Sequence, residues 1–127
     1  FEVKRKSYAE AVKLIIELSF SAKASTELKE KAAKQLEKIK PEVLYGDFEA
    51  CDKFDVMNQL KDIRVPTLII CGSEDQLTPV KFSEYLRDNI PNSRLEVIAD
   101  AGHMVMLEKP EEFNEKIRRF IMGLGGS

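Results

Sequence analysis

The chain has 127 residues, of which 43% are hydrophobic and 33% are charged, and its formal net charge is −2 at pH 7. This size and composition predict a modest hydrophobic core under a charged surface, and they exclude an intrinsically disordered chain. The small negative charge gives no general attraction to nucleic acid or to anionic membranes. No apolar run approaches the ~20 residues that a helix needs to span a bilayer.

Two cysteines, Cys51 and Cys71, are too few for a disulfide framework. Cys71 ends an apolar run, where we expect a small buried packing residue rather than a redox or nucleophilic thiol. Unpaired cysteines fit a reducing compartment, so the sequence favours the cytoplasm. The chain begins at Phe1 without a methionine, and the stretch Phe1–Lys6 is not expected to be a signal peptide. This start is typical of a fragment or a processed product.

The first part of the chain is predicted to be helical. Ser7 and Glu10 match a capping box, in which each side chain satisfies the other's backbone donor, at the start of a first helix. A second helix is expected to begin near Ser25 or Thr26. It is expected to stop at Pro41, because a proline disfavours the helical conformation in the residue before it.

Less regular structure is expected before the second half of the chain. Residues 42–54 have a predicted break at Gly46 and Asp47. A short helix follows, with Asp55 as its N-cap and Leu60 near its end. The stretch 61–65 then marks a boundary between a helical region, residues 1–62, and a second region, residues 63–127.

The second region alternates strands and helices. Within the predicted strand at residues 65–71, residues 68–71 form a continuous apolar run, typical of a parallel strand that is covered on both faces. Thr78 is the predicted N-cap of the next helix, with Pro79 at its first position. A second strand around residues 95–98 and a last helix from Pro110 to Gly123 follow. This order predicts an α/β fold with a βαβα unit, whose two strands are parallel with a right-handed crossover.

An acid and the only histidine lie at the carboxyl ends of the two predicted strands. Asp75 lies in the loop after the first strand, and His103 follows the second. Catalytic groups of open α/β sheets gather at this end, and adjacent strands lie only about 4.8 Å apart. The sequence therefore predicts a hydrogen bond between the Asp75 carboxylate and the imidazole. Such a bond fixes the tautomer and stabilises an imidazolium.

Other residues compete for these roles. Glu74 and Asp100 are alternative acids, but Glu74 is expected to be a solvated neighbour, and Asp100 precedes the histidine too closely to approach it from the other strand. A metal site built from Asp75, Asp100 and His103 is disfavoured, because the chain has one histidine and no H-x-x-x-H spacing. The remaining alternative is that Asp75 caps a loop and His103 is an ordinary surface or core histidine.

Three segments carry a family resemblance: the strand at 65–71 with its loop to Asp75 and Pro79, residues 101–104 around His103, and the tail at 107–113. Together they resemble the C-terminal part of the α/β-hydrolase superfamily, in its serine-hydrolase or esterase-like form. The resemblance covers residues 55–121 well and implies that the helices before them are the end of the cap, or lid, domain. It also implies that Asp75 is the acid of a Ser-His-Asp triad and His103 its general base.

The chain departs from this family at the nucleophile. The sequence contains no G-x-S-x-G elbow, and the elbow and oxyanion hole belong to an N-terminal half that is expected to be missing. Ser73 lies in the acid loop without the elbow pattern and is not expected to replace it. The implied enzyme hydrolyses small ester-like substrates without a metal or organic cofactor, and Met104, Val105 and Met106 are candidates to line its pocket. This chain alone is expected to be inactive.

The missing half leaves the strand at 65–71 with an unpaired, apolar edge. A two-stranded sheet is also only marginally stable by itself. The helical region could fold over this surface, the missing half could pair with the edge, or two copies of the chain could pair into one sheet. We expect a dimer or a higher oligomer. The alternative function is a non-catalytic module that associates with itself or binds a partner.

Overall fold

The structure is a computed structural model that describes residues 5–125, so that Phe1 lies outside the described part of the chain. Helices α1 (Arg5–Ser19), α2 (Thr26–Leu36) and α3 (Pro41–Lys53) come first, and a 3-10 helix, η1 (Met57–Asp62), follows them. The second region contains β1 (Thr67–Gly72), α4 (Val80–Asn89), β2 (Ser93–Ile98), the one-turn helix α5 (Val105–Glu108) and α6 (Pro110–Gly125). The predicted α/β order is confirmed, although α5 was not predicted. Among residues 5–125, no helix has the length and apolar character that crossing a membrane requires.

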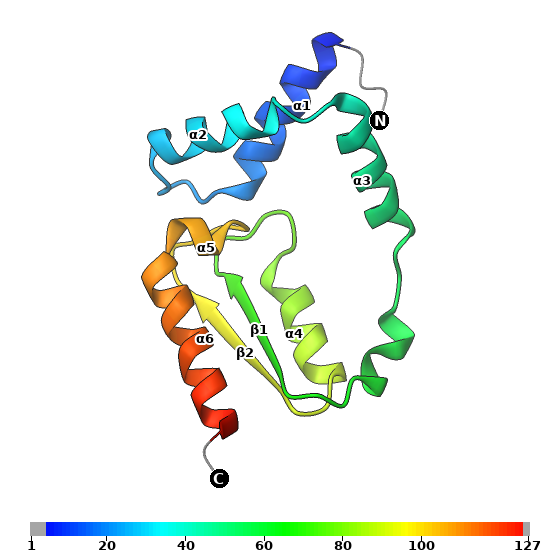
Figure 1. Cartoon of the computed structure of the whole chain (residues 1–127), viewed down its shortest axis with the longest axis vertical. Coiled ribbons are helices and arrows are strands. Elements are labelled where there is room, and N and C mark those ends of the chain that lie inside the picture. The colour runs from blue at the N-terminus through cyan, green and yellow to red at the C-terminus, as the bar shows by residue number, and fades with distance from the viewer. Residues whose placement is uncertain (1–4, 126–127) are drawn as a thin grey trace.

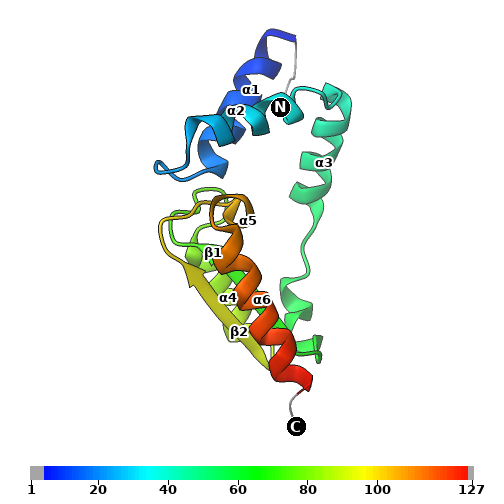
Figure 2. The same ribbon diagram turned by 60° about the vertical axis from the view of Figure 1, so that its left-hand side comes forward.

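The two strands form a parallel pair, as predicted, with Thr67 opposite Ser93 at one end and Gly72 opposite Ile98 at the other. Helices α4 and α6 flank the strands, and the carboxyl ends of both strands point toward the α1–α2 block (Figures 1 and 2). Helix α3 descends along one side and leads through η1 to the start of β1 (Figure 1). Within the described residues, β1 pairs with β2 alone and its other edge has no strand partner.

The core of the second region lies around the end of β2. Ile98 and Ala101 are fully buried, Val105 is nearly so, and α6 packs Phe113 against them. Burial alternates along β1: residues 69 and 71 are buried, and residues 68 and 70 are only partly buried. Because successive strand residues point to opposite faces, one face of β1 is covered and the other is partly open. The prediction of a strand covered on both faces is therefore wrong for this chain.

Two helix boundaries in the first region differ from the prediction. Helix α1 already includes Arg5, so Ser7 lies inside the helix and the predicted capping box is wrong. Helix α2 begins at Thr26, as predicted, and the hydroxyl of Ser25 caps it by accepting a hydrogen bond from the Leu28 N–H at 3.2 Å. Pro41 does not stop that helix but occupies the first turn of α3, where a missing N–H has no cost.

The stretch after Pro41 is more regular than predicted. Helix α3 runs through Gly46 without a break, because a single glycine costs a helix only about 1 kcal/mol relative to alanine. The predicted short helix is the 3-10 helix η1, with Val56 at its N-cap position, and Asp55 Oδ1 accepts the Met57 N–H at 2.9 Å. Helix α6 begins at Pro110 as predicted and continues past Gly123 to Gly125.

An ion pair between α6 and β2 predicts a pH dependence of stability. The ammonium of Lys116 donates to Glu96 at 3.0 Å, and this bond, helped by Arg94, holds the pKa of Glu96 below its usual value of 4.5. A carboxyl whose pKa is lowered on folding contributes stability above its unfolded-state pKa, and that contribution is lost as the pH falls through the folded-state pKa. We expect the free energy of unfolding, measured with urea, to fall less steeply below pH 4.5 in Glu96→Gln than in the unmodified chain. The exposed Glu84→Gln is the control and should keep the original slope.

Candidate active site

The loops after β1 and β2 lie against each other at the carboxyl edge of the sheet. The Ser73 N–H donates to the Ile98 carbonyl at 2.9 Å, and the Glu74 N–H donates to the Ala101 carbonyl at 2.8 Å, so backbone pairing continues past the strands. The approach is closest at Gly72, where a Cβ atom would lie 2.1 Å from the Ala101 carbonyl oxygen. Only glycine fits at this position, and it allows the two loops to touch.

Asp75 and His103 meet between these loops. The Nδ1 atom of His103 lies 2.9 Å from Oδ2 of Asp75, as the sequence predicts. The Asp75 side chain is 4% exposed and the His103 side chain is 38% exposed, so the acid is buried behind an accessible imidazole. Because a carboxylate only accepts hydrogen bonds, we assign the proton of the neutral imidazole to Nδ1. The lone pair of Nε2 is then available to take a proton.

The loop after β1 holds the carboxylate in a fixed orientation. Oδ1 of Asp75 accepts the N–H groups of Leu77 at 3.0 Å and Thr78 at 2.9 Å, and Oδ2 accepts the Thr78 hydroxyl at 3.0 Å. The same hydroxyl lies 3.1 Å from Nδ1 of His103. Thr78 therefore belongs to this site. The prediction that it caps α4 is wrong, because that helix starts at Val80 with Pro79 in the cap position.

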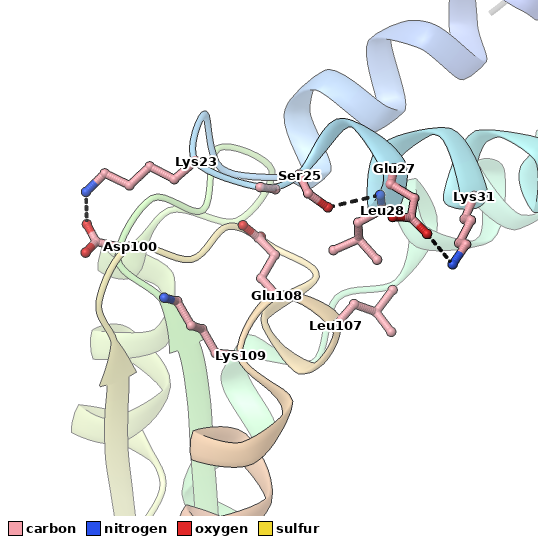
Figure 3. A pocket seen from close by; sticks show the side chains of 10 residues that line it. Lys23, Ser25, Glu27, Leu28, Lys31, Asp100, Leu107, Glu108 and Lys109 are labelled. Carbon is pink, nitrogen blue, oxygen red and sulfur yellow. Dashed lines mark hydrogen bonds and ion pairs between the residues drawn. The ribbon is translucent and has the colours of Figure 1, made fainter.

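The alternative acids are not bonded to the imidazole. The Asp100 carboxylate forms an ion pair with Lys23 (Figure 3), and this hydrogen-bonded pair lowers the pKa of Asp100 and raises that of Lys23. The hydroxyl of Ser73, a residue that is not expected to replace the nucleophile, accepts the Asp100 N–H at 3.0 Å. This bond joins the two loops. No three histidine, cysteine or acidic side chains gather as a metal site within the described part of the chain.

The end of α1 holds the opposite side of the loop that carries the histidine, called here the histidine loop (residues 99–104). The Met104 N–H donates to the Ser19 carbonyl at 2.9 Å. The Glu108 carboxylate accepts the Gly102 N–H at 2.7 Å and the Ser21 hydroxyl at 2.5 Å. A Cβ atom at Gly102 would lie 2.7 Å from the Ser21 nitrogen, so this contact also requires glycine. Sequence reasoning missed Glu108 because it did not predict the one-turn helix α5.

An apolar hollow of about 610 Å³ opens beside Asp75 and His103, between β1 and α6. Its apolar walls include Leu68, Ile70, Val105, Met106, Phe113, Ile117, Phe120 and Ile121. Val105 and Met106 line it as predicted, although Val105 is also buried in the core, and Met104 is not part of the lining. A separate, polar hollow of about 430 Å³ lies between the start of α2 and α5 (Figure 3).

Comparison with known proteins connects this geometry to a family. The family model described as "alpha/beta hydrolase fold" matches residues 17–110, a range that includes Asp75 and His103. The chain belongs to the alpha/beta hydrolase family. The resemblance inferred from the sequence motifs is therefore confirmed for the family and the fold of this chain.

Relatives of this alpha/beta hydrolase chain include esterases and lactonases. The pimeloyl-[acyl-carrier protein] methyl ester esterase of Neisseria meningitidis is 33% identical over 84 residues, which is 66% of this chain and 33% of the relative. The 3-oxoadipate enol-lactonase 1 of Acinetobacter baylyi is 33% identical over 96 residues, 73% of this chain and 36% of the relative. A thermophilic esterase of known structure has a TM-score of 0.85 and 40% identity, covering 95% of this chain and 48% of that chain. The chain thus spans about a third of the length of these curated relatives.

Proposed function

We propose that this chain supplies the acid, Asp75, and the general base, His103, of a Ser-His-Asp hydrolase that cleaves carboxylic ester-type bonds. The main support for this proposal is the 2.9 Å contact between His103 Nδ1 and the buried Asp75 carboxylate. The names of the relatives, a methyl ester esterase and an enol-lactonase, support a small acyl substrate. The proposed reaction uses neither a metal nor an organic cofactor.

In this mechanism His103 moves a proton in both directions. Nε2 takes the proton of a serine hydroxyl as that oxygen attacks the substrate carbonyl, and Asp75 stabilises the imidazolium. The imidazolium then gives the proton to the leaving alkoxide, which departs as an alcohol and leaves an acyl-enzyme. A water molecule then attacks the acyl-enzyme. His103 takes a proton from this water and returns it to the serine oxygen, and the carboxylic acid is released.

The given sequence contains no G-x-S-x-G. The serine and the oxyanion hole are therefore proposed to come from a segment outside this sequence. Within the chain, residues 1–62 are proposed as the end of the cap and residues 63–127 as the end of the catalytic core. The free thiols of Cys51 and Cys71 favour the cytoplasm as the compartment.

The free edge of β1 and the apolar hollow are the proposed docking surface for the nucleophile-bearing segment. The partly open face of β1 adjoins the imidazole that has to reach the serine. The chain covers 48% of the 40% identical esterase, and the rest of a protein of that size is large enough to cover this face. A second copy of the chain is the alternative occupant. Self-association without catalysis, through the same exposed edge, is the second candidate function.

Native mass spectrometry of the purified chain tests these proposals. Mass beyond multiples of 14.5 kDa identifies a companion segment, which a serine-reactive probe should label. Dimers or larger multiples without extra mass favour the self-associating module, and a monomer alone contradicts it. The chain is also mixed with the segment of the thermophilic esterase that lies outside the alignment. Ester hydrolysis is expected only in that mixture and should disappear with His103→Ala. Hydrolysis by the isolated chain, abolished by the same substitution, would contradict the proposal of an external nucleophile.

A further inference from the structure

The carboxylate of Glu108 joins two segments that are far apart in the sequence. Its Oε2 atom accepts the Gly102 N–H at 2.7 Å, and its Oε1 atom accepts the Ser21 hydroxyl at 2.5 Å. The Ser21 N–H lies 3.2 and 3.3 Å from the two oxygens. Figure 3 shows the Glu108 side chain rising from α5 toward the segment between α1 and α2.

The donors around this carboxylate need an acceptor. Ser21 is 1% exposed and Gly102 is buried, so water has little access to their N–H groups. Leaving a buried donor unpaired is costly, and bonds to an ionised acceptor are stronger than bonds to a neutral one. A glutamate, which offers two charged oxygens and donates nothing, therefore suits this position better than an amide or a hydroxyl.

The bonds of Glu108 act on the peptide next to His103. The Gly102 N–H is fixed by Glu108 on one side of the histidine, and the Met104 N–H is fixed by the Ser19 carbonyl at 2.9 Å on the other. The imidazole itself is held by Asp75 at 2.9 Å. The backbone of the histidine loop is therefore anchored to the end of α1, and the side chain is anchored to the loop after β1.

We propose that Glu108 is a positioning residue for His103. Its carboxylate ties the histidine loop to Ser21, so the helical segment at residues 5–36 sets the position of the imidazole relative to Asp75. The catalytic consequence rests on the proposed function, whereas the positioning itself is a property of this chain alone. The helical segment then acts on the general base directly, in addition to its proposed place in the cap.

The single histidine makes this proposal testable by NMR on the isolated chain, because every imidazole signal belongs to His103. The unmodified chain should give one set of signals with the proton on Nδ1. Glu108→Ala removes both acceptor oxygens and should broaden or double these signals and mix the two tautomers. Glu108→Gln keeps one acceptor oxygen and places an NH₂ group against the donors, so it should produce a smaller change in the same direction.

Two measurements separate positioning from general stability. Glu111→Gln removes an equal charge from an exposed site on α6 and should leave the imidazole signals unchanged. Urea denaturation of every variant identifies the conditions in which each is folded. A purely structural role would lower the free energy of unfolding while the folded Glu108→Ala chain kept the original imidazole signals. That result would overturn the proposal.

Catalysis by the mixture of this chain with the segment of the thermophilic esterase, called here the reconstituted mixture, provides a second readout. A misplaced general base should lower kcat about 10²-fold in Glu108→Ala with KM unchanged, whereas Glu111→Gln should keep the original kcat. An unchanged kcat in folded Glu108→Ala would also overturn the proposal. If the unmodified mixture hydrolyses no ester, the proposed function fails, and the imidazole signals of the isolated chain still decide the role of Glu108.

Discussion

Gly72→Ala is expected to destabilise the fold more than alanine at any other glycine among residues 5–125. The new Cβ atom would lie 2.1 Å from the Ala101 carbonyl oxygen and 2.4 Å from that of Gly102. Both are backbone atoms that cannot rotate away, so the two loops have to separate. We expect a loss of about 4 kcal/mol or more, a large part of the ~5–15 kcal/mol that holds a typical domain. Urea denaturation followed by circular dichroism measures this loss.

Gly46→Ala is the matched control for this prediction. A Cβ atom at Gly46 meets nothing within 4 Å, and the residue lies inside α3, where alanine favours the helix by up to about 1 kcal/mol. This variant should be as stable as the original chain or slightly more stable. If Gly72→Ala were equally well tolerated, the contact between the two loops would not be the constraint that the structure indicates.

Asp75→Asn is expected to lower kcat of the reconstituted hydrolase about 10⁴-fold. The amide oxygen of asparagine should keep the place of Oδ1, because the N–H groups of Leu77 and Thr78 need an acceptor there. The NH₂ group then faces Nδ1 of His103 and donates to it. This reverses the tautomer, so Nε2 carries the proton and cannot take one from a serine.

The reversal can be observed without any catalysis. Nitrogen-15 NMR of the isolated chain should show the imidazole proton on Nε2 in Asp75→Asn and on Nδ1 in the original. Asp100→Asn is the control, since its carboxylate pairs with Lys23 rather than with the imidazole. Equal effects of the two substitutions on kcat, or an unchanged tautomer in Asp75→Asn, would refute the assignment of Asp75 as the acid partner.

The sequence alone determined the order of the two strands and of helices α4 and α6, and it predicted that Asp75 and His103 meet. An apolar run bounded by turn residues is a local signal, and strands joined through a helix are parallel, so their carboxyl ends meet at one edge. The hydrogen bond between Asp75 and His103 followed from those two facts. Their catalytic roles remain a proposal that rests on this geometry and on the family.

Only the tertiary structure decided how this site is supported. Thr78 followed by proline matches a helix cap in sequence, but its hydroxyl lies between Asp75 and His103. Gly72 and Glu108 show their roles only when distant groups approach them, the Ala101 carbonyl in one case and the Ser21 hydroxyl in the other. These contacts join segments far apart in the chain, and local propensity contains no information about them. The bond between acid and histidine was therefore predictable from local patterns, whereas the residues that hold it in place became visible only in the folded chain.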